Sequence, residues 1–316
     1  MFGLMMAMTT NHVKAAGDPD FIKERRALYL KTAAMTGVPW NVLAAVDQYE
    51  RNVRGSRRDL PDAEGPVAIW MAPERWAGTL NPEPRNPFYI DLFNGFGKDG
   101  NGDGQAMMDN PEDALFSMAD YLSSFGLSKE NLRLALWNYY HKDKAVAIIM
   151  EIADMYKRFG TIDLGERAFP IPRGYRYDYR STWGARRGWG GLRIHEGTDL
   201  FADYGTPVRA TSYGVIEMKG WNRYGGWRLG IRDPKNVYHY YGHLSGYAKN
   251  VKKGGIVKPG QMIGYVGSSG YGPEGTQGKF PPHLHYGMYK DNGKTEFSFD
   301  PYPYLRAWER QERMKK

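Results

Sequence analysis

A strand that carries two histidines is the feature that most constrains the fold of this 316-residue chain. Two prolines precede the sequence His283-Leu284-His285-Tyr286, and proline is typical of the start of a strand. In a strand, residues two apart point to the same face. His283 and His285 should therefore face one side, while Leu284 and Tyr286 should face a core on the other. The motif predicts one wall of a polar cleft in a β-sheet.

Composition limits the chemistry of that cleft. The chain has no cysteine, so thiolate ligands and cysteine nucleophiles are excluded, and a metal must be held by His, Asp or Glu. The first 165 residues carry a net charge of −4, and the remainder carry +12. A basic second half favours an anionic partner such as an acidic wall polymer. Nucleic acid is not expected as the partner, because the basic residues are dispersed and no nucleic-acid-binding motif is present.

The first 17 residues do not belong to either predicted domain. Their apolar start, Met1 to Met8, is far shorter than the roughly 20 residues that span a bilayer, so no transmembrane segment is expected. Small residues follow it, as at the end of a secretory signal. We interpret residues 1–17 as the remnant of an export signal, which implies an exported protein; a disordered apolar terminus is the alternative.

Residue patterns divide the rest into a helical domain at 18–162 and a β domain at 189–303, joined by a linker at 163–188. Apolar residues at helical spacing predict helices over 18–36, 40–52, 111–125 and, as a pair, between 129 and 160. Beyond the linker, short β patterns punctuated by glycine and proline predict an antiparallel sheet. A charged surface helix is expected at 304–316. The predicted fold class is therefore two domains, α then β.

Several stretches of the helical domain together match one known family: Gly37-Val38-Pro39, Leu43-Ala44-Ala45-Val46 with Glu50, Asp99 to Gly104, Ala119-Asp120-Tyr121-Leu122, and Ala135-Leu136 with Tyr139. They resemble the lysozyme-like domain of lytic transglycosylases, which cleave the glycan strands of peptidoglycan. The resemblance implies that Glu50 is the general acid, a role that needs a raised pKa. Trp70 and Tyr140 depart from the family pattern, as if two supporting polar groups were lost. We therefore favour glycan binding by an inactive module over catalysis by Glu50, with a solvated helix-end carboxylate as a further alternative.

The same half contains a calcium-like spacing. Asp99, Asn101 and Asp103 are followed by Gly104, which matches the first oxygen ligands of a calcium loop. The twelfth position is Asn110 in place of the bidentate glutamate. We expect a glycine-rich turn here, with a weak calcium site as the alternative.

His195 and Asp199 stand four residues apart and allow two interpretations. On a helix they would imitate a His-Glu-x-x-His zinc motif with Glu196 as the base. However, Gly197 and Thr198 are poor helix formers, and the flanking segments are short and strand-like. A bent loop after a strand is the better interpretation, and Glu196 then points away from the site.

Three motifs in order give the β domain a specific likeness: His195 with Asp199, the run Tyr240-Tyr241-Gly242-His243-Leu244-Ser245, and His283-Leu284-His285. They resemble the zinc peptidases of the lysostaphin and LytM type, peptidase family M23. The resemblance implies that His195, Asp199 and His285 bind one zinc ion, while His243 and His283 face its water. Three such ligands leave a fourth position for water, whose pKa zinc lowers to about 7. The long connection Ser268 to Pro282 should wall this cleft.

The combination of these two domains resembles sporulation peptidases of bacilli. That resemblance implies hydrolysis of the bond between L-Ala and D-Glu in peptidoglycan of the spore cortex, and a location in the cell wall or cortex. Two alternatives from other classes remain: a non-catalytic protein that binds or scaffolds peptidoglycan, and a lytic transglycosylase or muramidase acting through Glu50. Degenerate binding relatives usually lack a zinc ligand, and all three are present here.

Overall fold

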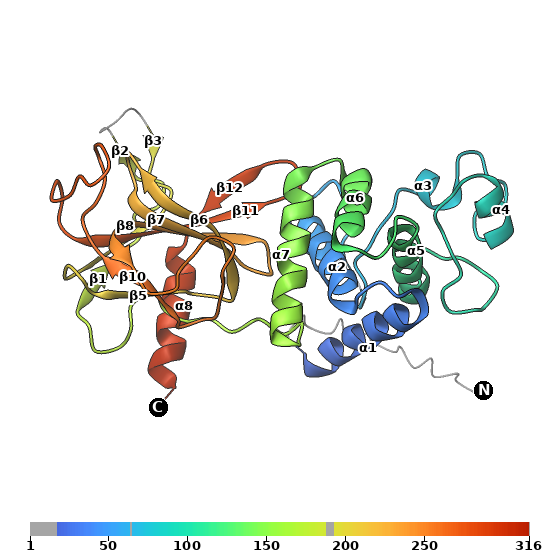
Figure 1. Ribbon diagram of the computed structural model, residues 1–316, viewed down its shortest axis with the longest axis horizontal. Helices are drawn as coiled ribbons and strands as arrows, with labels where there is room; N and C mark the ends of the chain where they lie inside the picture. The colour runs from blue at the N-terminus through green and yellow to red at the C-terminus, as the bar shows by residue number, and fades with distance from the viewer. Residues whose placement is uncertain (1–17, 64, 188–192, 316) are drawn as a thin grey trace, which may run out of the picture.

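The computed structural model describes residues 18–63, 65–187 and 193–315, in which a helical part is followed by a β part (Figure 1). The expected export-signal remnant at 1–17 lies outside this range. The helices are α1 (Pro19–Thr36), α2 (Trp40–Arg54), α3 (Pro73–Ala77), α4 (Pro87–Leu92), α5 (Pro111–Ser123), α6 (Lys129–Tyr140), α7 (Asp143–Phe159) and α8 (Tyr302–Met314). None of these described helices combines the length and the apolar composition needed to cross a bilayer.

The helical part confirms the predicted helices, and its boundaries follow from local chemistry. Asp18, Asn110 and Ser128 each precede a helix and accept a hydrogen bond from a backbone N–H of its first turn. Helix α2 is buried along most of its length and packs against α7. Its last turns carry Glu50, so a carboxyl group is held inside the helical part.

The β part is one large antiparallel sheet beside a two-stranded ribbon. Its strands are β1 (Tyr177–Tyr179), β2 (Arg186–Arg187), β3 (Arg193–Ile194), β4 (Thr198–Ala202), β5 (Pro207–Arg209), β6 (Gly214–Asn222), β7 (Gly226–Arg232), β8 (Val237–Tyr247), β9 (Ile256–Val257), β10 (Met262–Val266), β11 (His283–Asp291) and β12 (Glu296–Phe299). The main path runs β1-β4-β11-β8-β7-β6-β9, and every pairing is antiparallel as predicted. Strand β11 thus lies between β4 and β8, which places Asp199 of β4, His243 of β8 and the two histidines of β11 together.

Two segments expected to lie outside the β domain are part of it. Residues 177–179, within the segment predicted as a linker, pair with β4 as strand β1. Helix α8 begins at Tyr302 and buries Leu305 and Trp308 in the core of the β part, so one of its faces is covered. The core face of the sheet is therefore covered by more of the chain than the strand patterns alone indicated.

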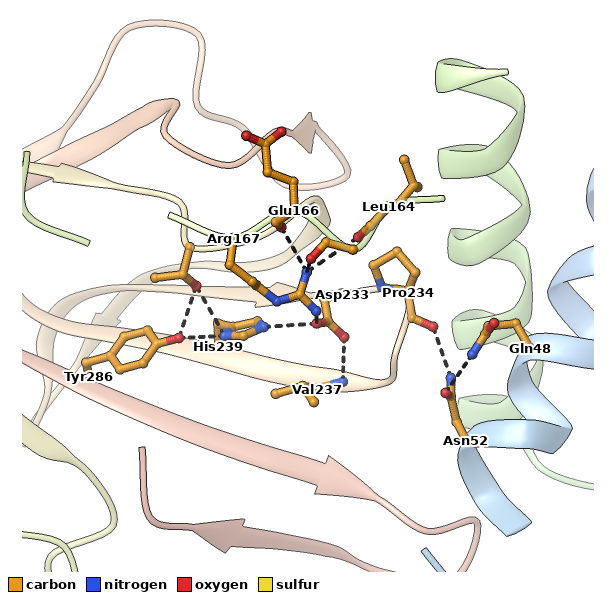
Figure 2. A network of polar contacts seen from close by, with 12 residues as sticks. Gln48, Asn52, Leu164, Glu166, Arg167, Asp233, Pro234, Val237, His239 and Tyr286 are labelled. Carbon is orange, nitrogen blue, oxygen red and sulfur yellow. Dashed lines mark hydrogen bonds and ion pairs between the residues drawn. The ribbon is translucent and has the colours of Figure 1, made fainter. Parts of the chain in front are cut away.

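The helical part contacts the turn that begins β8 (Figure 2). Asn52 of α2 donates a hydrogen bond to the carbonyl of Pro234 at 3.0 Å. Beside it, Asp233 is fully buried, accepts from the backbone N–H of Val237 at 2.9 Å, and forms an ion pair with Arg167 at 2.8 Å. The start of strand β8 is thus held against both the helical part and the connecting segment.

The far end of β11 contacts the helical part as well. Lys144 at the start of α7 pairs with Asp291 and with Glu296, each at 3.1 Å. Lys142 donates to the carbonyl of Gly293 in the β11–β12 hairpin at 2.7 Å. Strand β8 therefore begins, and strand β11 ends, at the contact between the helical part and the β part. Both strands carry cleft histidines.

Candidate metal centre

Three side chains, two from neighbouring strands and one from the loop before β4, converge at one end of the cleft. Asp199 of β4 lies directly opposite His285 of β11 in the antiparallel register, and the loop before β4 supplies His195. Asp199 Oδ1 lies 2.9 Å from His285 Nδ1 and 3.1 Å from His195 Nε2, and these two nitrogens are 2.9 Å apart. The sequence-predicted ligands are thus brought together, with all ligand atoms within 4.8 Å of one another.

The chemistry of this donor set fits a divalent zinc ion. Ligand atoms around a tetrahedral zinc ion lie about 3.3 Å apart, because each Zn–N or Zn–O bond is about 2.0–2.1 Å long. The separations in this group are close to that value. Two imidazole nitrogens and one carboxylate oxygen leave one coordination position open, which is the pattern of catalytic rather than structural zinc sites.

Backbone carbonyls orient the imidazoles. Nδ1 of His195 donates to the carbonyl of Thr182 at 2.9 Å, which leaves its Nε2 directed to Asp199 and His285. Such partners fix the tautomer of a ligating histidine. Sequence reasoning missed Thr182, and no sequence signal could have found it, because every residue type supplies a backbone carbonyl.

His243 and His283 form the adjacent part of the site. Their Nδ1 atoms donate to the carbonyls of Ser269, at 2.7 Å, and Pro281, at 2.8 Å. Their ring centroids are 4.8 Å apart, and Nε2 of His283 lies 3.8 Å from Asp199 Oδ1. Both rings therefore turn the second nitrogen away from the backbone and toward the cleft, where it can hold or deliver a proton.

The two faces of β11 are as predicted: His283 and His285 line the cleft, while Leu284 and Tyr286 are fully buried in the core. Strand β8 departs from simple alternation. Tyr241 points into the core, so a regular strand would bury His243 on the same side. A β-bulge in which Gly242 and His243 both lie opposite Arg228 turns His243 to the cleft instead.

The bulge places His243 in an uncommon backbone conformation. Its φ is 62°, in the left-handed region that few residues other than glycine adopt. Its N–H donates to the carbonyl of Gly225 at 2.7 Å, and its ring is held by Ser269. Because such strain persists only where the surroundings fix it, these contacts are what keep His243 in the site.

Electrostatics set the protonation states that a metal centre needs. Burial acts to raise the pKa of Asp199, but its polar contacts with His195 and His285 outweigh burial and hold that pKa well below its usual range. Burial, together with the neighbouring His283 and His285, lowers the pKa of His243 to about 3. Burial also lowers the pKa of His285. At neutral pH Asp199 is therefore ionised and the imidazoles of His243 and His285 are neutral, as a metal centre requires.

The cleft around these groups has a volume of about 800 Å³. Tyr271 and Phe280, from the Ser268 to Pro282 connection, contact the ring of His243, so this connection does wall the cleft. His195 lies in a bent loop, not on a helix, as the second interpretation predicted. Contrary to expectation, Glu196 does not point away from the cleft. It lines the rim and accepts hydrogen bonds from Tyr289 and Ser298, outside the ligand group.

His239, which precedes the cleft histidine of β8, lies on the other face of the sheet. It is fully buried, and its ring nitrogens contact the hydroxyl of Tyr286 at 2.6 Å and Asp233 at 3.3 Å (Figure 2). The network of His239, Tyr286, Asp233 and Arg167 therefore supports β8 and β11 from behind the site.

The second predicted site, at Glu50, is far from this cleft along the chain. Burial raises the pKa of Glu50 to about 7, and Tyr140 donates a hydrogen bond to its carboxylate at 2.6 Å. The expectation that a polar partner is lost at Tyr140 is therefore wrong, because the phenol hydroxyl supplies one. Glu50 is a buried, hydrogen-bonded carboxyl and not a solvated one.

The calcium-like segment forms a tight turn. The carboxylate of Asp99 accepts hydrogen bonds from the backbone N–H groups of Gly102, Asp103 and Gly104. Asn101 and Asp103 also bond to each other at 3.0 Å. The side-chain oxygens of this segment are thus used within the turn itself.

The residues of the cleft are those of a metal-dependent hydrolase, and comparison with known proteins identifies the family. Residues 193–297 match the model of peptidase family M23. The L-Ala--D-Glu endopeptidase of Bacillus subtilis (strain 168) is 59% identical over 305 residues, which cover 96% of this chain and 93% of that protein. The chain belongs to peptidase family M23.

Other relatives match a smaller share of this chain. Lysostaphin of Staphylococcus staphylolyticus is 40% identical over 116 residues, which cover 36% of this chain and 22% of lysostaphin. The solved catalytic domain of lysostaphin from Staphylococcus simulans is 36% identical, covers 42% of this chain and 92% of that domain, and has a TM-score of 0.33.

Replacing Gly197 by alanine should disrupt the candidate metal centre. A Cβ atom at this position would lie 2.6 Å from Cε1 of His285 and 2.7 Å from the carbonyl oxygen of Tyr286, so the imidazole must move. We expect zinc affinity, measured by titration of the metal-free protein, to fall about tenfold or more. Gly246→Ala is the matched control, because a Cβ there meets no atom within 4 Å. Wild-type zinc affinity in Gly197→Ala would contradict this account of the site.

Glu50 should make the stability of the helical part depend on pH. Its folded pKa of about 7 exceeds the ordinary value of 4.5, so its contribution is present below pH 4.5 and is lost as the pH rises through 7. Relative to Glu50→Gln, the free energy of unfolding of the wild type should fall by about 3 kcal/mol across this window. Urea unfolding followed by helical circular dichroism measures it; parallel pH profiles of the two proteins would show the assignment to be wrong.

Proposed function

We propose that this chain is a zinc-dependent endopeptidase that hydrolyses the bond between L-Ala and D-Glu in the stem peptides of peptidoglycan. The observation that carries the proposal is the convergence of His195, Asp199 and His285 on the face of a cleft that also holds His243 and His283. The near full-length likeness to a protein named for this bond supports the choice of substrate. The proposed place of action is the cell wall, with the spore cortex as the layer in question.

His195, Asp199 and His285 would hold the zinc ion. A zinc ion bound there supplies a Lewis acid that polarises a carbonyl oxygen and makes water nucleophilic near neutral pH. No glutamate base is required for this arrangement, which agrees with the position of Glu196 at the rim, outside the ligand group.

The imidazoles of His243 and His283 would carry out the proton transfers of the reaction. Cleavage of an amide leaves a nitrogen that must receive a proton, and it builds negative charge on the former carbonyl oxygen. With Nδ1 of each ring bonded to a backbone carbonyl, Nε2 is the atom that can exchange a proton with substrate. The two rings lie 4.8 Å apart, so both can serve the same reacting group.

The helical part would bind the glycan strand that carries the stem peptide. Its likeness to lytic transglycosylases motivates this proposal, and its contacts at the start of β8 and the end of β11 would set the distance between glycan and cleft. A second candidate activity, glycan cleavage through Glu50, is favoured by the raised pKa of that carboxyl and by its hydrogen bond from Tyr140. New saccharide ends that disappear in Glu50→Gln would establish it.

The proposed division of labour predicts two separable losses. His285→Ala should lose both bound zinc and hydrolysis, whereas His243→Ala should retain zinc and lose at least about a hundredfold in kcat. Zinc content by mass spectrometry, together with mass spectrometry of digested peptidoglycan with and without a chelator, measures both. His141→Asn, at the exposed cap of α6, is the matched histidine control.

New amino-terminal D-Glu that appears only without chelator would support the proposal. A His285→Ala protein that keeps zinc and activity would contradict the ligand assignment, and chelator-resistant saccharide ends would move the chemistry to Glu50. A wild type that binds zinc and releases no product from several wall preparations would favour the non-catalytic binding protein.

A further inference from the structure

The cleft is electrically uneven along its length. Among the described residues that line it, Lys279 is the one lysine or arginine, whereas Glu196 is an exposed carboxylate on the rim. Glu196 contacts Tyr289 at the far end of β11, and Lys279 belongs to the connection that leads into His283 at its start. Six residues of strand separate Tyr289 from His283, a distance of about 20 Å. The negative group therefore lies toward the far end of β11, and the positive group lies toward its start.

The end that carries Lys279 is also the end of the two proton-handling imidazoles. Nζ of Lys279 donates to the carbonyl of Tyr271 at 2.8 Å. The ring of Tyr271 stacks on that of His243, with 6.1 Å between centroids, and Phe280 lies 4.6 Å from His243 and 5.1 Å from His283. The ammonium group is thus tied to the wall that holds His243 and His283.

This wall is built by specific contacts. Ser269 accepts from His243 through its carbonyl and donates from Oγ to the carbonyl of Leu244 at 2.6 Å. The backbone N–H of Gly278, next to Lys279, donates to Oγ of Ser268 at 3.0 Å. Both ends of the connection are therefore tied to each other and to β8, which gives the lysine a defined place relative to the imidazoles.

The proposed substrate carries a negative charge that can pair with Lys279. In an amide cleavage the leaving nitrogen must lie beside the proton-handling imidazoles, so the residue that supplies this nitrogen occupies the His243 and His283 end. In the bond proposed above that residue is D-Glu. A glutamate has two carboxyl groups and uses one of them in the next amide bond, so the other remains as an anion. The substrate then presents a carboxylate at the end where the cleft has its cation.

We propose that Lys279 is a specificity-determining residue that binds the free carboxylate of the acidic residue on the leaving-group side of the scissile bond. A lysine offers a compact charge on a flexible stem, suited to a single carboxylate. Glu196 adds discrimination, because a substrate bound in the reverse direction would bring its carboxylate toward a like charge. This inference rests on the proposed function and adds the feature of the substrate that the cleft selects.

The test uses one stem peptide in two forms, with the D-Glu carboxylate either free or converted to its amide. Wild-type protein should cleave the acid form with a kcat/KM about tenfold higher than the amide form, mainly through KM, because a charge-assisted contact is lost on amidation. In Lys279→Met this preference should fall to near unity, and Lys279→Arg should retain most of it. Lys253→Met, at an exposed turn position that is not among the residues lining the cleft, is the control for loss of a lysine.

The outcomes separate this inference from the function on which it rests. A wild type that cleaves both forms equally, or a Lys279→Met protein that keeps the wild-type preference, would overturn the role of Lys279 while leaving the peptidase intact. A wild type that cleaves neither form but releases other products from whole peptidoglycan would overturn the assigned bond and, with it, this role. Zinc content equal to wild type in Lys279→Met confirms that the variant is folded around its metal centre.

Discussion

The register between β4 and β11 is the constraint on which the site depends. Asp199 and His285 lie directly opposite each other in this antiparallel pair, and their side chains meet at 2.9 Å. A shift of one residue would turn every side chain of one strand to the other face. The buried residues Leu284 and Tyr286 prevent that shift, because it would move them out of the core. Core packing on one face thus holds the metal ligands on the other.

The two parts of the chain are coupled through the same strands. Strand β8 begins at a turn held by Asn52, and β11 ends where Asp291 meets Lys144. Behind the cleft, His239 and Tyr286 join these strands through buried hydrogen bonds that extend to Asp233 and Arg167. The helical part is therefore attached directly to the strands that carry the cleft histidines.

Much of the candidate site could be predicted because its signals are local. Alternation within β11 gives the faces of His283 and His285, and the poor helix formers after His195 indicate a loop there. His243 shows the limit, because simple alternation buries it with Tyr241, and only a bulge turns it to the cleft. That bulge depends on Gly225 and Ser269, which are distant in sequence.

The hydrogen-bond partners that the tertiary structure supplies could likewise not be predicted from the sequence. The carbonyl of Thr182 orients His195, and the hydroxyl of Tyr140 donates a hydrogen bond to Glu50 where a lost polar group was expected.

The most direct test of the central claim is anomalous diffraction at the zinc absorption edge from crystals of the zinc-loaded protein. The account predicts one strong peak within bonding distance of His195 Nε2, Asp199 Oδ1 and His285 Nδ1. A peak elsewhere, or full activity in crystals without a peak in the cleft, would contradict it.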